Sequence, residues 1–137
     1  MNSKRFGYLS EAAVLVYLPQ SIWASKDPKL STFDILWHGI KIEVKGTRKN
    51  SPYYNFGLGN GIYTSIRSKW YRKSKMIHPD VFVFVGWNKG NIDYWVINKK
   101  RLGKKDSLII GETSKWNIYK VSNKEKLGEY IERENEL

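Results

Sequence analysis

The sequence predicts an α/β domain with a central mixed β-sheet flanked by helices. Two apolar alternations, Phe33–Trp37 and Ile40–Val44, are separated by His38-Gly39 and predict a tight hairpin. The continuous apolar run Val81–Trp87 predicts a central strand that is buried on both faces. Helical patterns before and after these strands complete the class.

The chain begins with a predicted helix and a loop. Residues 4–18 carry apolar side chains around most of the helix circumference, so we expect this helix to be buried, and Pro19 ends it. Glu11 shares a face with apolar residues of this helix. Residues 19–32 are expected to form a loop with a short strand at Ile22–Ala24.

The hairpin is predicted to have one apolar and one charged face. Its apolar face carries Phe33, Ile35, Trp37, Ile40, Ile42 and Val44. On the other face Asp34 is expected directly opposite Glu43, with Lys45 one step further along. Opposed carboxylates repel each other, so either a shared proton or a divalent cation is expected between them. The alternative is a solvated face that carries no chemistry.

Basic and aromatic segments follow the hairpin. Residues 53–63 mix aromatic residues with glycines, which predicts an irregular binding loop. Bases could stack on its rings, or the rings could belong to the core: Tyr53, Tyr54, Phe56 and Tyr63. Residues 64–75 predict an amphipathic basic helix, and residues 98–105 a basic loop.

The C-terminal part is predicted to return to the sheet. Residues 92–97 are expected to form a strand beside the central one, and residues 116–121 a late strand. Ser122 and Glu125 have the spacing of a capping box, which predicts a final helix that ends near Asn135.

The composition favours a nucleic-acid partner. The net charge is +11, and five of the thirteen acids lie within residues 125–137, which leaves the rest of the chain still more basic. This balance predicts binding to nucleic acid first and to an anionic membrane second. The cations expected to bind DNA are Lys26, Lys29, Arg48, Lys49, Arg67, Lys69, Arg72, Lys73, Lys75, Lys99, Lys100 and Arg101.

Length and residue usage set further bounds. The 137 residues suggest one domain, residues 1–137. The absence of cysteine excludes disulfides and thiolate chemistry. No apolar run reaches the roughly 18 residues of a transmembrane helix, so we expect no segment that spans a membrane. We also expect a cytoplasmic protein that is associated with DNA and has no membrane partner.

Residues 8–97 resemble the PD-(D/E)xK nuclease superfamily, which has a restriction-endonuclease-like core. The resemblance rests on a helical Glu11, Asp34 at a hairpin entry, and Glu43-Val44-Lys45 on the next strand, before a helix and a buried strand. Phe33 stands where the eponymous proline would be. Size and charge are similar to those of small dimeric Holliday-junction resolvases, while restriction and homing enzymes share the same core.

The resemblance implies a Mg²⁺-dependent DNA endonuclease without an organic cofactor. Mg²⁺, or Mn²⁺ as a substitute, would be bound by Asp34, Glu43, Val44 and Glu11. The catalytic residues would be Glu11, Asp34, Glu43 and Lys45, with Lys45 positioning or activating the attacking water. For Glu11 the alternative is an N-terminal helical acid that the helix dipole stabilises.

Two other functions remain open from the sequence. One is a non-catalytic DNA-binding module on the same fold. The other is an RNA-binding protein or a ribonuclease that uses His38 and His78. Cutting both strands of DNA needs two active sites, so we expect a homodimer, with an interface drawn from exposed rings among Trp87, Tyr94, Trp95 and Trp116.

Overall fold

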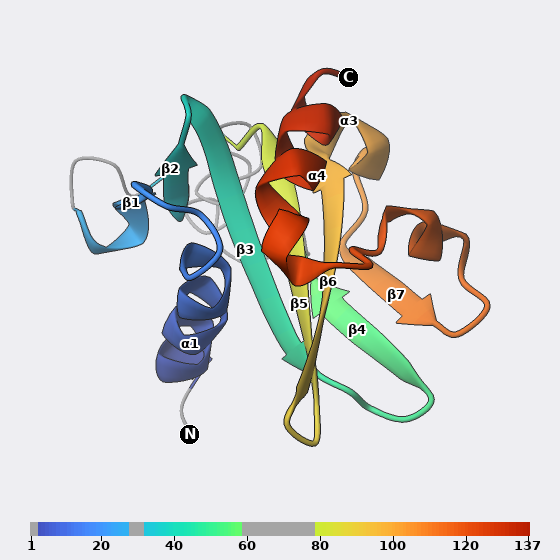
Figure 1. The fold of residues 1–137 in the computed structure, drawn as a ribbon. Coiled ribbons are helices and arrows are strands. Elements are labelled where there is room, and N and C mark those ends of the chain that lie inside the picture. Colours follow the sequence, from blue (N-terminus) through green and yellow to red (C-terminus); the bar gives the residue numbers. More distant parts are fainter. Residues whose placement is uncertain (1–2, 28–31, 59–78) are drawn as a thin grey trace, which may run out of the picture.

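The computed structural model describes residues 3–27, 32–58 and 79–137 (Figure 1). The helices of this part are α1 (Ser3–Leu15), η1 (Ala24–Lys26), α3 (Lys99–Leu102), η3 (Lys115–Tyr119), η4 (Lys124–Lys126) and α4 (Leu127–Asn135), where η marks a 3₁₀ helix. The strands are β1 (Ile22–Trp23), β2 (Ile35–Trp37), β3 (Ile40–Arg48), β4 (Tyr53–Gly57), β5 (Val81–Asn88), β6 (Asn91–Asn98) and β7 (Ser107–Gly111).

The described strands form a mixed five-stranded sheet in the order β1-β2-β3-β5-β6 and a separate two-stranded sheet of β4 and β7. In the larger sheet only β3 and β5 are parallel, and the other neighbours are antiparallel. The predicted α/β class with a central mixed sheet is therefore confirmed. Among the described residues, no helix is both long and apolar enough to cross a membrane.

The hairpin of β2 and β3 has the predicted register. Trp37 pairs with Ile40, and Ile35 pairs with Ile42. His38 and Gly39 close the turn with φ of 50° and 76°, the left-handed backbone that two-residue hairpin turns favour because it matches the twist of the strands.

Two apolar cores cover the two faces of the larger sheet. On one face α1 and α4 pack over alternate residues of β3 and β5, among them Val44 and Val83 (Figure 1). On the other face the small sheet and α3 pack over Phe82 and Phe84. Residues Val81 to Gly86 of β5 are buried, as the continuous apolar run predicts.

Several elements predicted to follow the hairpin are wrong. Residues 53–57 form strand β4 rather than an irregular loop, because they pair with β7, which the sequence analysis did not predict. The predicted basic loop at 98–105 begins with helix α3, which Asn98 caps by accepting the N–H of Lys100. The predicted helix at 64–75 lies outside the described residues.

The predicted late strand at 116–121 is largely the 3₁₀ helix η3, since the Ser114 side chain accepts the N–H of Trp116 and so caps a helical turn. The cap before the final helix is also displaced by one residue. Asn123 rather than Ser122 accepts the N–H of Glu125. The Ser122 hydroxyl instead lies 2.8 Å from that of Tyr130.

Helix α1 lies close against β3 at Gly46. A Cβ atom at this position would overlap Ser10 Oγ and lie 2.6 Å from Ser10 Cβ. We expect Gly46→Ala to lower the free energy of unfolding by about 1–3 kcal/mol, because the helix has to move away from the sheet. Urea titration followed by circular dichroism measures this loss.

Gly57→Ala on β4 is the matched control, since a Cβ there meets no atom within 4 Å. We expect its effect to stay within about 0.5 kcal/mol. Equal unfolding midpoints for the two variants would contradict the close approach of α1.

Tyr94 of β6 also holds α1, since its hydroxyl donates to the Ala13 carbonyl over 2.9 Å. Burial raises the pKa of Tyr94 to about 12 from the ordinary 10.0, with a smaller contribution from Tyr17. The stabilisation is complete below pH 10 and is lost as the pH rises through about 12.

We expect Tyr94→Phe to lose about 0.5–1.5 kcal/mol at neutral pH and to show a shallower stability decline in this window. Parallel alkaline profiles for both proteins would contradict this role.

Candidate active site

Asp34 leaves the strand pairing and turns its carboxylate toward β3. The ladder of β2 and β3 ends at the pair Ile35 and Ile42, and the Asp34 N–H donates to the Ile42 carbonyl over 2.9 Å. Asp34 Oδ2 accepts the N–H of Val44 at 2.8 Å. The predicted direct pairing with Glu43 is thus replaced by a side-chain contact, and the carboxylate lies beside the peptide unit that joins Glu43 to Val44.

Glu43 and Lys45 lie on the face of β3 that continues onto Phe82 and Phe84 of β5. Glu43 is buried, with 4% of its surface exposed. The Lys45 side chain is 25% exposed, and its Nζ lies 3.3 Å from Glu43 Oε2. The structure therefore brings Asp34, Glu43 and Lys45 to one stretch of β3, and Lys45 is the most exposed of the three.

Glu11 is buried and points toward β1 and η1. Its carboxylate accepts the indole N–H of Trp23 at 2.7 Å and the hydroxyl of Ser25. The N–H of Ser25 in turn donates to the Asp34 carbonyl over 3.1 Å. Glu11 thus supports the segment next to Asp34, through partners that the helical pattern alone does not reveal.

The helix-dipole alternative for Glu11 is wrong. The first turn of α1 contains no acid, and Glu11 lies nearer the C-terminal end of the helix. A dipole stabilises carboxylates only within the first turn. The hydrogen bonds from Trp23 and Ser25 are what compensate for the burial of this carboxylate.

The oxygen ligands that Asp34, Glu43 and Val44 offer beside β3 suit a hard cation. Among the described residues, no three His, Cys, Asp or Glu side chains lie close enough together to hold a metal ion. Asp34 and Glu43 offer two carboxylates, and Val44 can offer only its backbone carbonyl. Mg²⁺ often takes one or two carboxylates and completes its shell with water and phosphate oxygens, so these residues fit Mg²⁺ without Glu11.

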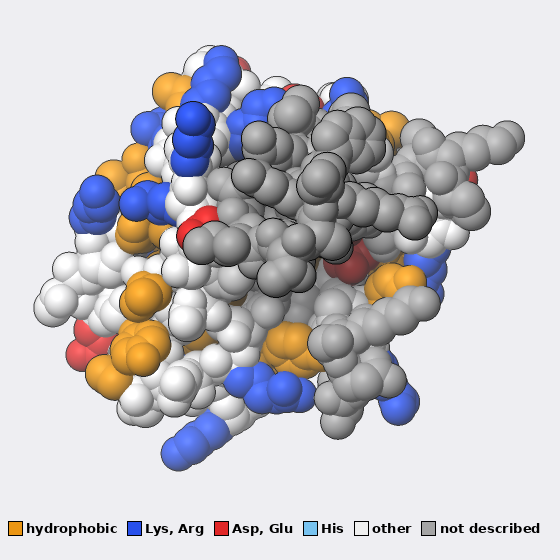
Figure 2. All heavy atoms as spheres, turned by 180° about the vertical axis from the view of Figure 1, so that it is seen from behind, with side chains coloured by type: hydrophobic (Ala, Val, Ile, Leu, Met, Phe, Trp, Pro, Cys, Tyr) orange, Lys and Arg blue, Asp and Glu red, His pale blue; other side chains and the backbone are white. Residues whose placement is uncertain are grey.

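Half of the predicted DNA-binding cations lie outside the described residues: Lys29, Arg67, Lys69, Arg72, Lys73 and Lys75. Lys26 Nζ lies 4.0 Å from the centre of the Trp23 ring, and Arg48 Cζ lies 4.3 Å from the centre of the Phe6 ring. Figure 2 shows Lys and Arg side chains spread over the described part of one face, with few acids among them.

The cations near α3 have structural partners. Arg101 forms an ion pair with Glu134 of α4, and this hydrogen bond holds the pKa of Arg101 above its ordinary value. Lys100 Nζ donates to the Leu137 carbonyl over 3.2 Å. These contacts tie α3 to the C-terminal helix. Lys99 is partly buried at the start of α3.

Four of the seven described aromatic residues considered for stacking or dimer contacts are buried. Tyr54 has 6% of its surface exposed and Phe56 has 1%, and both belong to the second core. Only 3% of the surface of Tyr94 and 2% of that of Trp95 is exposed, so these two are not among the exposed rings from which a dimer interface could be drawn. Trp87 and Trp116 are partly buried, and Tyr63 lies outside the described residues.

His38 has a structural place in the hairpin turn. Its ring stacks on Trp37 with 3.9 Å between the ring centres, and its Nδ1 lies 2.9 Å from Glu132 Oε1. His78 lies outside the described residues. The turn position of His38 gives no support to a two-histidine ribonuclease.

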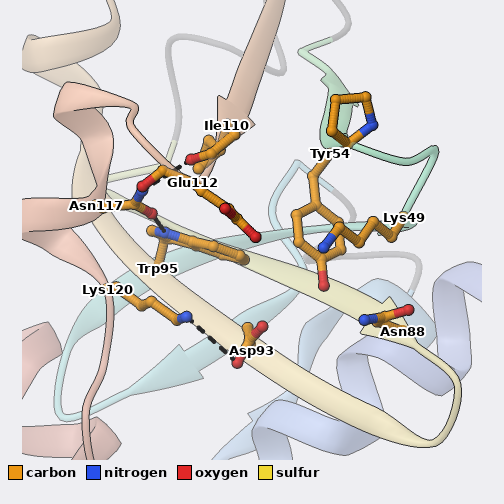
Figure 3. A pocket seen from close by; sticks show the side chains of 11 residues that line it. Lys49, Tyr54, Asn88, Asp93, Trp95, Ile110, Glu112, Asn117 and Lys120 are labelled. Atoms are coloured by element: carbon orange, nitrogen blue, oxygen red, sulfur yellow. Dashed lines mark hydrogen bonds and ion pairs between the residues drawn. The ribbon is translucent and has the colours of Figure 1, made fainter.

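A hollow of about 390 Å³ lies between the small sheet, β6 and η3 (Figure 3). Its carboxylates, Asp93 and Glu112, face the same space as Lys49 and Lys120, and Lys120 Nζ lies 3.7 Å from Asp93 Oδ1. Burial, together with Asp93, raises the pKa of Tyr54. The balanced charge makes this hollow a poor site for phosphate.

Comparisons of the chain with models of protein families, with curated proteins and with solved structures give no match.

We expect Glu11→Ala to lower the free energy of unfolding by about 1–3 kcal/mol, because Trp23 and Ser25 lose a charged acceptor. Glu11→Gln keeps one acceptor oxygen and should lose less. Thermal unfolding measures both, and Trp23 fluorescence, compared with that of a Trp23→Phe variant, reports on the local change. If both variants unfold like the parent protein, these hydrogen bonds do not support the loop.

Proposed function

We propose that this chain is a Mg²⁺-dependent DNA endonuclease that hydrolyses phosphodiester bonds. The observation that carries the proposal is the hydrogen bond from the Val44 N–H to Asp34 Oδ2. It puts a second carboxylate beside Glu43, whose own Oε2 lies 3.3 Å from the Lys45 ammonium group. Two buried carboxylates beside a partly exposed lysine suit the binding and hydrolysis of a phosphodiester.

Each residue has a distinct role in the proposed reaction. Asp34 and Glu43, with the Val44 carbonyl, would hold Mg²⁺, which when bound supplies positive charge and lowers the pKa of water. Lys45 donates hydrogen bonds to the phosphate or to the attacking water and so stabilises the charge that develops on oxygen. Glu11 acts as a positioning residue, through Ser25 and the backbone of Asp34.

The arrangement of the strands supports a restriction-endonuclease-like core. A helix with a buried glutamate precedes an antiparallel hairpin, and β5 then lies parallel to β3. This is the order of elements on which the resemblance to PD-(D/E)xK nucleases rests. The net charge of +11 supports DNA as the substrate. A homodimer is part of the proposal, since paired cuts need two active sites.

We expect purified protein to cut at least one of plasmid, linear duplex and four-way-junction DNA in Mg²⁺ and none of them in EDTA. Lys45→Ala should lower the cleavage rate by roughly 10²–10³-fold, because one charged donor to the developing anion is lost. Asp34→Asn and Glu43→Gln should abolish cleavage while binding in EDTA persists. Gel electrophoresis of timed reactions measures the rates.

Asp80→Asn is the matched control. This carboxylate lies just before β5 and accepts the N–H of Lys41 at 2.9 Å, so we expect normal cleavage from the variant. Paired cuts on a junction would favour a resolvase, and a single plasmid site a restriction or homing enzyme. Binding without cleavage of any substrate, by the parent protein and by Asp34→Asn alike, would leave a non-catalytic DNA-binding module and overturn the proposal.

A further inference from the structure

A second hollow, of about 350 Å³, lies between α1, the end of β3 and the turn that joins β5 to β6. We call it the α1 groove. The described residues of its wall are apolar or basic, namely Phe6, Leu9, Arg48, Lys49, Trp87 and Lys89, beside the turn glycine Gly90. Its volume falls in the range of roughly 300–1,000 Å³ that is typical of ligand pockets.

The cations are fixed at the rim by the ends of strands. Arg48 is the last residue of β3 and lies 4.3 Å from the centre of the Phe6 ring. The Lys49 N–H donates to the Trp87 carbonyl over 2.9 Å. Lys89 and Gly90 form the hairpin turn, with φ of 49° and 86°. The Lys49 ammonium group lies 5.9 Å from the centre of the Tyr54 ring, in the first hollow. Arg48 and Lys89 remain as the cations of this rim, and no acid lies among its described residues, which favours an anionic ligand.

The floor of the groove is aromatic and held in place. The Phe6 and Trp87 rings lie 5.8 Å apart, tilted by 55°. The Trp87 indole N–H donates to Ser10 Oγ over 3.0 Å, and Trp87 packs against the first core. Both rings remain partly exposed, and Leu9 beside them is 42% exposed.

This combination distinguishes an unpaired strand from a duplex. Rim cations alone can contact the phosphates of either form. Only an unpaired base can leave its own stack and lie on an aromatic floor, and such stacking tolerates any base. A duplex would leave the rings and Leu9 without a partner.

The groove lies on the opposite face of the larger sheet from Lys45. Arg48 follows Lys45 by three residues on β3, roughly 10 Å along the strand, and this odd spacing turns the two side chains to opposite faces. The groove is therefore a surface separate from the candidate active site.

We propose that the α1 groove binds an unpaired nucleotide of a DNA substrate, so that the enzyme acts on DNA that has a single-stranded part. This inference rests on the proposed function for the identity of the ligand. It assigns the aromatic groove to the unpaired base and Arg48 and Lys89 to the adjoining phosphates.

Fluorescence anisotropy in EDTA tests the groove without catalysis. The probes are a labelled single strand of roughly twelve nucleotides and the duplex of the same sequence. We expect Lys89→Glu to weaken binding of the single strand about tenfold and to make its salt dependence shallower. Trp87→Leu should weaken the single strand by about five- to tenfold and leave the duplex within twofold.

Lys124→Glu is the matched control, because it makes the same charge change at an exposed position of η4. We expect less than a twofold effect from it. Lys89 is exposed in a turn, so its variant keeps the test valid if Trp87→Leu fails to fold, which thermal unfolding shows. Equal losses for Lys89→Glu and Lys124→Glu, or tighter binding of an RNA strand of the same sequence, would overturn the inference.

The two proposals fail separately. If groove variants lose single-strand affinity and the parent protein never cuts, the proposed catalysis fails and the groove remains a single-strand site. If the parent protein cuts DNA and the groove variants bind and cut like it, the groove inference alone fails.

Discussion

The parallel pairing of β3 with β5 is the constraint on which the rest of the structure depends. Parallel neighbours require a crossover connection, and the described part of this connection includes β4 of the smaller sheet. Both faces of the pair are then covered, one by α1 and α4 and the other by the small sheet and α3. Because the register sets Glu43 beside Phe82 and Lys45 beside Phe84, polar side chains are held within an apolar face, where electrostatic interactions are stronger than in water.

The buried acids near this pair have different tasks. Asp34 completes the edge of β3 where the ladder with β2 stops, since its carboxylate takes the N–H that a further strand residue would have bound. Glu11 connects α1 to the loop before the hairpin through Ser25. A carboxylate that satisfies a backbone or indole donor recovers much of the cost of its burial. The fold can therefore keep acids in place before any ligand arrives.

Local sequence patterns predicted strands correctly where the paired strands are close in sequence and failed where they are distant. The hairpin register followed from the alternation around His38-Gly39, and β5 from its apolar run. Strands β4 and β7 pair across about fifty residues, so neither segment shows its partner locally, and the glycines of 53–63 suggested a loop instead.

The same limit applies to the candidate site. Asp34, Glu43 and Lys45 were found because they lie on one hairpin, whereas the link from Glu11 to Trp23 joins a helix to a separate strand. Lys89 and Phe6 meet Arg48 only after folding.

The environment of Trp23 has a consequence for sequence variation. Its indole N–H points to Glu11 in the ring plane, while Lys26 lies over the ring face. At position 23, phenylalanine would keep an aromatic face for Lys26 and lose the N–H donor to Glu11, whereas glutamine would keep a donor and lose the ring face. We therefore expect positions 11, 23 and 26 to vary together in related sequences, because a change at one alters which residues the other two can accept.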